Sequence, residues 1–164
     1  MLDLTLITLT ATAALAAAMM AGTFFAFSNF IMPGLKRAAP AHGIEAMQQI
    51  NITVMNPGAM GFFIGGAVLG VALIALAGYH HDHPAATFIL AGALLYTLGT
   101  FVVTAAGNVP LNEALAKHDA NSPEALSLWQ RYLPVWTRWN TLRTLAATAA
   151  TACYVVALVR LAAW

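Results

Sequence analysis

The sequence predicts an all-α protein: a single domain over residues 1–164, folded as a bundle of four helices that span a membrane. Composition is the first reason, because 60% of the residues are hydrophobic and only 8% are charged, whereas soluble domains carry roughly a quarter charged residues. Length is the second reason, because a helix needs about 20 apolar residues to cross a bilayer. Four segments meet this requirement, and they are residues 4–31, 57–78, 86–106 and 141–162. Helices are favoured because the backbone of a lipid-exposed segment must satisfy its own hydrogen bonds.

Start and stop signals delimit these helices in order along the chain. The first apolar run is preceded by the acidic residue Asp3 and by no basic residue. We therefore expect a retained span and not a cleaved signal peptide. Asn56-Pro57 predicts an N-cap and a first-turn proline for the second span. Ser122-Pro123-Glu124 predicts a helix start in the connection before the fourth span, and Pro134 is expected to break that helix before the span begins.

The two long connections, residues 32–56 and 107–140, lie on the same side of the predicted bundle. Each is expected to be partly helical. In the first, the stretch GIEAMQQINITVM places apolar side chains on one face, as in an amphipathic helix at a membrane interface. The residues of this face are Ile44, Met47, Ile50 or Asn51, and Val54.

The basic residues predict the orientation. Six of the seven lie on the side of the two long connections, and they are Lys36, Arg37, Lys117, Arg131, Arg138 and Arg143. The positive-inside rule places that side in the cytoplasm. We therefore expect a multi-pass protein of the inner (plasma) membrane, in contact with the lipid bilayer. Both termini and the short turn YHHDHP would lie outside.

Several classes of function are disfavoured. A net charge of +1 without a basic cluster gives no surface for nucleic acid. The single Cys153 excludes an internal disulfide or a cysteine-based zinc site. The spans contain no Asp, Glu or His, which argues against axial haem ligands and against a proton-coupled transporter. The histidines of the YHHDHP turn are interpreted as solvated, so the sequence predicts no metal site and no cofactor.

A faint repeat links the first and third spans. Gly-Thr-Phe occurs at residues 22–24 and 99–101, and each copy is followed by an asparagine, Asn29 or Asn108, and then by a proline. The pattern is compatible with a parallel duplication, which would bring the two asparagine-bearing helix ends face to face. It is equally compatible with chance recurrence in this composition.

A polar set gathers near the same ends of the helices. Its members are Asn29, Gln48, Asn51, Asn108, Asn112, Asn140, Arg143, Trp136 and Trp139. Within this set, Trp139, Asn140 and Arg143 follow Trp136 at spacings of three, four and seven residues. These spacings place the four side chains on one helical face. Simpler readings remain open: Asn108 as an N-cap, Gln48 and Asn51 as the wet side of an interfacial helix, the tryptophans as an aromatic belt, and Arg143 as a snorkelling cation.

Arg143 argues for more than anchoring. It lies about one turn inside the last span, where no carboxylate of the spans can pair with it. Amides and a guanidinium beside Trp136, Trp139, Phe24 and Phe101 predict a pocket for a flat, apolar molecule that carries oxygen.

At these residues the chain resembles the DUF1772 family, small four-helix membrane proteins that include the anthrone oxygenases of polyketide pathways. The stretches that carry the resemblance are GTFFAFSNFIMPGL, AMQQIN, GTFVVTAAGNVPLN and RYLPVWTRWNTLRT, and together they cover nearly the whole chain. The matching polar positions are Asn29, Gln48, Asn51, Asn108, Asn112, Trp139, Asn140 and Arg143. The resemblance implies an oxidoreductase that oxidises an anthrone or related polycyclic phenol with dioxygen, without an obvious metal or flavin.

This chemistry assigns expected roles. Arg143 with Asn108, Asn112 or Asn140 would stabilise the substrate oxyanion, and Trp139 would offer a stacking surface. His42, His118 or a water held by amides would serve as the base. Two alternatives stay open: a non-catalytic accessory protein that binds a quinone or lipid, and a structural subunit of a membrane complex. A homo-oligomer is compatible with each of these readings.

Overall fold

The computed structural model describes the backbone of residues 2–163 and the side chains of residues 4–163. The helices are joined into rods, a word used here for a continuous run of helical elements. The first rod consists of α1 (Leu2–Ala26), the π-helical turn η1 (Phe27–Ile31) and α2 (Met32–Arg37). α3 (Pro40–Thr53) and α4 (Pro57–Tyr79) follow. The next rod consists of α5 (Ala86–Tyr96), the π-helical turns η2 (Thr97–Val102) and η3 (Thr104–Asn108), and α6 (Val109–Ala116). α7 (Pro123–Ala162) completes the chain.

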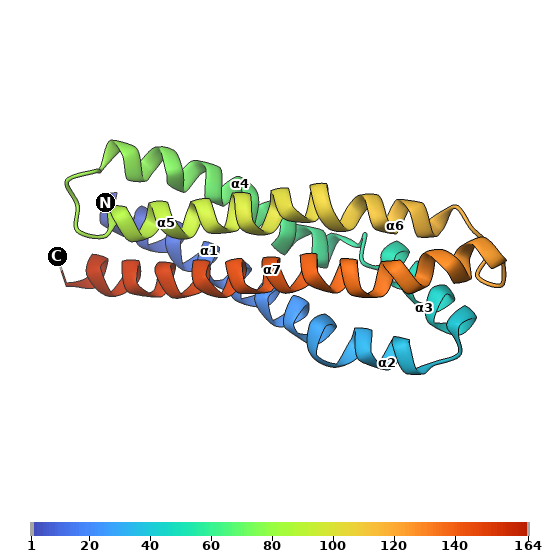
Figure 1. Cartoon of the computed structure of the whole chain (residues 1–164). Helices are drawn as coiled ribbons and strands as arrows, with labels where there is room; N and C mark the ends of the chain where they lie inside the picture. Colours follow the sequence, from blue (N-terminus) through green and yellow to red (C-terminus); the bar gives the residue numbers. More distant parts are fainter. Residues whose placement is uncertain (1, 164) are drawn as a thin grey trace.

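Four of these rods are long and apolar enough to cross a membrane: Leu4–Arg37, Pro57–Tyr79, Ala86–Ala116 and Pro123–Ala162. No strand occurs in the described part of the chain. The predicted all-α, four-span architecture of a multi-pass membrane protein is therefore confirmed. The helices extend beyond the predicted spans mainly at one end of the bundle, where α2, α3, α6 and the first half of α7 form a cap (Figure 1).

Both termini and the turn between α4 and α5 lie at the opposite end from the cap (Figure 1). α7 is the central element, because α1 and α5 both pack along it, while α4 packs against α5 and α1. Small residues allow these close approaches. A Cβ atom at Gly66 of α4 would lie 2.7 Å from the ring of Tyr96, so no larger residue fits there without a shift.

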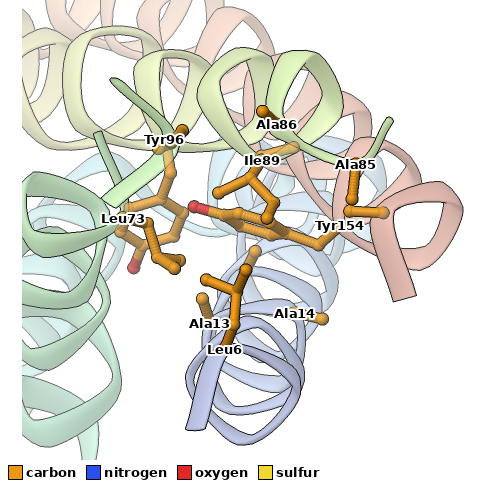
Figure 2. Close-up of a cluster of buried hydrophobic side chains, with 14 of the residues drawn as sticks. Leu6, Ala13, Ala14, Leu73, Ala85, Ala86, Ile89, Tyr96 and Tyr154 are labelled. Atoms are coloured by element: carbon orange, nitrogen blue, oxygen red, sulfur yellow. The ribbon is translucent and has the colours of Figure 1, made fainter. Parts of the chain in front are cut away.

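Two hydrophobic cores stabilise the bundle. The first, here called the alanine-rich core, fills the half near the termini. Figure 2 shows Tyr154 of α7 lying there between Leu6 and Ala13 of α1 on one side and Ile89 of α5 on the other. The second, the cap core, consists of Met32, Ile44, Met47, Leu115, Ala125, Trp129, Tyr132 and Trp136.

Two predicted helix starts are confirmed. The side chain of Asn56 accepts a hydrogen bond from the backbone N–H of Ala59 at 3.0 Å, and the hydroxyl of Ser122 accepts one from Ala125 at 3.1 Å. Each cap is followed by a proline in the first turn, where no backbone N–H is needed.

The predicted break at Pro134 was wrong, because α7 runs without interruption from Pro123 to Ala162. Pro134 lacks an N–H and leaves the carbonyl of Gln130 without its helical partner. Both residues are exposed, so this carbonyl can be solvated outside the bundle, and the helix tolerates the proline.

The helix predicted in the first connection is confirmed as α3. Ile44 and Met47 of its apolar face are buried in the cap core against Leu115 and Trp129. Val54, the last residue of the predicted face, lies just beyond the end of α3 and is exposed. The apolar face is therefore divided, and its first half packs on protein.

Candidate functional site around Arg143

Arg143 lies at the boundary between the two cores, on the inner face of α7, and only 6% of it is exposed. Its guanidinium carbon is 3.9 Å from the ring centroid of Phe24, a member of the alanine-rich core. The same atom is 5.2 Å from the ring of Trp136, a member of the cap core. The charge is thus held between two aromatic rings, an arrangement that stabilises a cation by about 1–2 kcal/mol per ring when it is desolvated.

The polar partners of Arg143 are all neutral. Nε and Nη2 donate to the side-chain oxygen of Asn140 at 3.0 and 2.7 Å, and Nη1 donates to the hydroxyl of Thr104 at 3.1 Å. No ion pair involves Arg143 within the described residues. A guanidinium carries five N–H groups, so two of them have no acceptor among the side chains and carbonyls that the structure describes.

Asn140 holds this guanidinium in place and is itself fully bonded. Its side-chain nitrogen donates to the carbonyl of Phe24 at 2.6 Å and to the hydroxyl of Ser28 at 2.7 Å. Both acceptors belong to the region where α1 changes to the π-helical turn η1. Such wide turns shift backbone groups out of the regular ladder and are frequent at functional sites.

Thr104 connects the other neighbouring helix to the guanidinium. Its hydroxyl donates to the carbonyl of Thr100 at 2.7 Å and accepts from Arg143. Thr104 begins η3, so π-helical turns border the Arg143 cluster on two sides, η1 on one rod and η3 on the other.

Asn108 ends η3 and is 1% exposed. Its side-chain nitrogen donates to the carbonyl of Trp136 at 3.2 Å, but its side-chain oxygen has no hydrogen-bond partner among the described residues. It makes no capping hydrogen bond to α6. Asn108 thus occupies the predicted N-cap position of α6, but its side chain does not cap the helix, because its amide bridges to α7.

A second polar layer lies inside the cap. The side-chain oxygen of Asn112 accepts hydrogen bonds from the hydroxyl of Tyr132 and from Nε1 of Trp136, both at 2.8 Å. The side chain of Asn51 also interacts with that hydroxyl. Gln48 donates to the carbonyls of Leu115 and His118, both at 2.9 Å, and so fastens α3 to the end of α6.

Three further expected site residues lie apart from both the Arg143 cluster and this second layer. Asn29 is exposed, so the two asparagines of the Gly-Thr-Phe repeat do not face each other. Trp139 is 38% exposed and covers Gly107, where a Cβ atom would come within 2.5 Å of its ring. Phe101 packs on Phe63, with ring centroids 5.2 Å apart. The structure thus groups Phe24, Trp136, Asn140 and Arg143, with Asn108 beside them.

Sequence reasoning missed Ser28, Thr104 and Tyr132. Thr104 lies four residues before Asn108, and Ser28 lies four residues after Phe24, so a search for hydroxyls at helical spacing from the chosen residues would have found both. Tyr132 lies four residues before Trp136 on the same face and was accessible to the same argument.

A family model for anthrone oxygenases matches residues 53–153. The chain belongs to the anthrone oxygenase family. No curated protein and no solved structure matches it. The matched region of this anthrone oxygenase family member contains Asn108, Asn140 and Arg143, whereas Phe24 and Ser28 of α1 and η1 lie outside it.

Clusters of metal-ligating side chains and hollows are the other features of the described residues that could mark a site. No group of three or more His, Cys, Asp or Glu side chains comes together within the described residues. An apolar groove of about 450 Å³ runs between α1 and α4, and its walls include Leu15, Gly61 and Leu69. A second hollow lies at the start of α7, beside Glu124 and Arg131. Neither is lined by Arg143.

Proposed function

We propose that this family member oxidises an anthrone or a related polycyclic phenol with dioxygen, and that the reaction takes place beside Arg143. The observation that carries the proposal is a buried guanidinium that is bonded only to neutral groups and keeps two N–H donors free. A buried charge without a counter-charge is costly, and an anionic ligand oxygen would compensate it.

The proposed role of Arg143 is to stabilise a substrate oxyanion. Removal of a methylene proton from an anthrone gives an anion whose charge is delocalised onto the carbonyl oxygen. Donors that are fixed before the reaction stabilise such an oxygen strongly in a buried site of low dielectric constant. Asn140 keeps the guanidinium in position, and the rings of Phe24 and Trp136 shield it from solvent.

The proposed reaction is balanced without a further reductant. The carbanion carbon forms a bond to dioxygen, and the resulting peroxide takes up one proton. Cleavage of its O–O bond and loss of the remaining hydrogen on that carbon give the second carbonyl and one molecule of water. One anthrone and one dioxygen thus yield one quinone and one water.

The proton acceptor in this scheme is a water molecule. Among the described residues, neither His42 nor His118 forms a hydrogen bond with Arg143, Asn140 or Thr104. His42 is an exposed residue of α3, and His118 lies in the turn between α6 and α7. The charge of Arg143 would favour the proton loss, because it stabilises the anion that remains.

We further propose that the cap faces the cytoplasm. Lys36, Arg37, Lys117, Arg131 and Arg138 belong to the elements at this end of the bundle, whereas Arg160 lies near the opposite end. The positive-inside rule then places the cap in the cytoplasm and the Arg143 site near that face of the membrane.

The test is turnover by purified protein in lipid nanodiscs with a panel of anthrones, recorded as quinone formation above the rate without protein. Arg143→Leu is expected to reduce kcat/KM by at least about 100-fold, the loss typical of a removed oxyanion donor. Arg138→Leu, an exposed position on the same helix, is the matched control and should retain turnover. Equal activity of a folded Arg143→Leu protein would contradict the proposal.

A second candidate is a binding protein without chemistry, favoured by the lack of an imidazole or carboxylate at the Arg143 cluster in the described part of the chain. It predicts Arg143-dependent binding of quinones with no oxidation of any anthrone. Metal content should be measured in the same preparations, so that turnover by a bound metal is recognised.

A further inference from the structure

We infer that Asn108 is a specificity-determining residue, whose buried amide oxygen accepts a hydrogen bond from a hydroxyl group of the ligand. This inference rests on the proposed binding of an oxygen-bearing ring system at Arg143. It adds a second recognition point, which would select ligands with a free hydroxyl at a defined ring position.

The first support is the orphaned acceptor itself. The side-chain nitrogen of Asn108 faces the carbonyl of Trp136, and only an N–H group can form that bond, so the orientation of the amide is fixed. The oxygen then points away from this carbonyl and has no donor within the described residues, although the residue is 1% exposed. Buried polar atoms are nearly always paired, so an unpaired acceptor at a candidate site indicates a missing donor.

The second support is the position of this acceptor relative to the free donors of Arg143. Thr104 bonds to Arg143, and Asn108 follows Thr104 by four residues on the same rod. Both side chains reach α7, one at Arg143 and one at Trp136. The guanidinium and the orphaned oxygen therefore lie at separate, neighbouring points along one seam between η3 and α7.

This separation determines which hydroxyl can be recognised. A hydroxyl on the ring carbon next to a carbonyl bridge donates internally to that carbonyl, so its hydrogen is not available to Asn108. A hydroxyl one ring position farther away cannot reach the carbonyl. It can donate to Asn108 while the carbonyl oxygen, or the oxyanion derived from it, accepts from Arg143.

The test uses quinones, which bind without turning over: anthraquinone, 1-hydroxyanthraquinone, 2-hydroxyanthraquinone and 2-methoxyanthraquinone. Dissociation constants are measured with the full-length protein in nanodiscs. Each dissociation constant is referred to the concentration of ligand in the lipid, measured with protein-free nanodiscs, so that unequal partition of the four compounds does not enter the comparison. We expect 2-hydroxyanthraquinone to bind about 10- to 100-fold more tightly than the other three, because only it supplies the missing donor. Asn108→Leu should abolish this preference, and Gln130→Leu, an exposed amide on α7, should leave it unchanged.

The methoxy compound keeps the test decisive if Asn108→Leu does not fold, because it removes the donor from the ligand and leaves the protein intact. Equal affinity for the hydroxy and methoxy compounds, or an unchanged preference in folded Asn108→Leu, would overturn the inference. If the quinones bind and Arg143→Leu abolishes binding but no hydroxyl is preferred, the Asn108 inference alone fails. If no quinone binds to the wild-type protein, both the Asn108 inference and the proposed ligand site at Arg143 are contradicted.

Discussion

The side-chain oxygen of Asn140 accepts hydrogen bonds from two nitrogens of Arg143, one turn farther along the same helix, at 3.0 and 2.7 Å. This pair is fastened to α1 through the carbonyl of Phe24 and the hydroxyl of Ser28. An amide, which donates on one side and accepts on the other, can link a guanidinium to a backbone carbonyl. An aspartate would accept from Arg143 but would lack the donor that α1 requires.

Replacing Asn140 should therefore destabilise the bundle. Asn140→Leu removes the main acceptor of a buried cation, and we expect a loss of about 3–5 kcal/mol, as when one partner of a buried charged pair is deleted. Thermal unfolding in detergent measures the effect. Thr141→Val at the neighbouring exposed position loses an exposed hydroxyl that bonds to the carbonyl of Thr137 and to Ser28 but leaves the acceptor of Arg143 in place, and should change stability by less than about 1 kcal/mol. Equal stability of the Asn140→Leu and wild-type proteins would show that this link contributes nothing.

The paired bonds to Asn112 predict coupling between two substitutions in the cap. Tyr132→Phe removes the hydroxyl that donates to Asn112 and also interacts with Asn51, and should cost about 1–2 kcal/mol. Asn112→Leu leaves both the Tyr132 hydroxyl and the Trp136 indole N–H without their acceptor, and should cost about 2–4 kcal/mol. The double variant should lose less stability than the sum of the losses of the two single variants, because each single variant already removes the bond between Tyr132 and Asn112. Strict additivity would mean that the bond between Tyr132 and Asn112 does not form.

Two adjacent glycines of α4 should respond in opposite ways to the same change. A Cβ atom at Gly66 would meet the Tyr96 ring at 2.7 Å, whereas one at Gly65 would meet nothing within 4 Å. Gly66→Ala should cost about 1–3 kcal/mol through overpacking. Gly65→Ala should stabilise the helix by about 0.4–1 kcal/mol, because it restricts the unfolded chain. The two midpoints of unfolding provide the comparison, and a reversed order would contradict the packing of α4 on α5.

The proposed orientation can be read from the accessibility of single cysteines. Cys153 is the one native cysteine, so Cys153→Ala gives a background for His81→Cys in the α4–α5 turn and Lys117→Cys in the cap. A thiol reagent that does not cross membranes should label the first variant in intact cells. It should label the second only after the cells are opened. The opposite pattern would place the cap outside.

The buried face of α7 was predictable from spacing, but its edges were not. Asn140 and Arg143 lie four and seven residues from Trp136, and all three are buried. Trp139 lies three residues from Trp136, about 60° back around the helix at 3.6 residues per turn. That step places it at the edge of the buried face, and it is 38% exposed.

The π-helical turns could not be predicted, because they alter the phase that periodicity arguments assume. η2 and η3 widen the turns between Thr97 and Asn108, so a regular 3.6-residue register does not describe which side chains face α7. Pro134 shows a related limit. The sequence indicates that a proline breaks a helical ladder, whereas only the structure shows that this proline faces away from the bundle.

Oxidation by dioxygen at Arg143 can be followed with ¹⁸O₂. Purified protein in nanodiscs is given an anthrone under the labelled gas, and the quinone is analysed by mass spectrometry after correction for the reaction without protein. Our account predicts one labelled oxygen per quinone at a rate that Arg138→Leu retains and a folded Arg143→Leu protein loses. Unlabelled quinone, or equal protein-dependent rates for both variants, would contradict it.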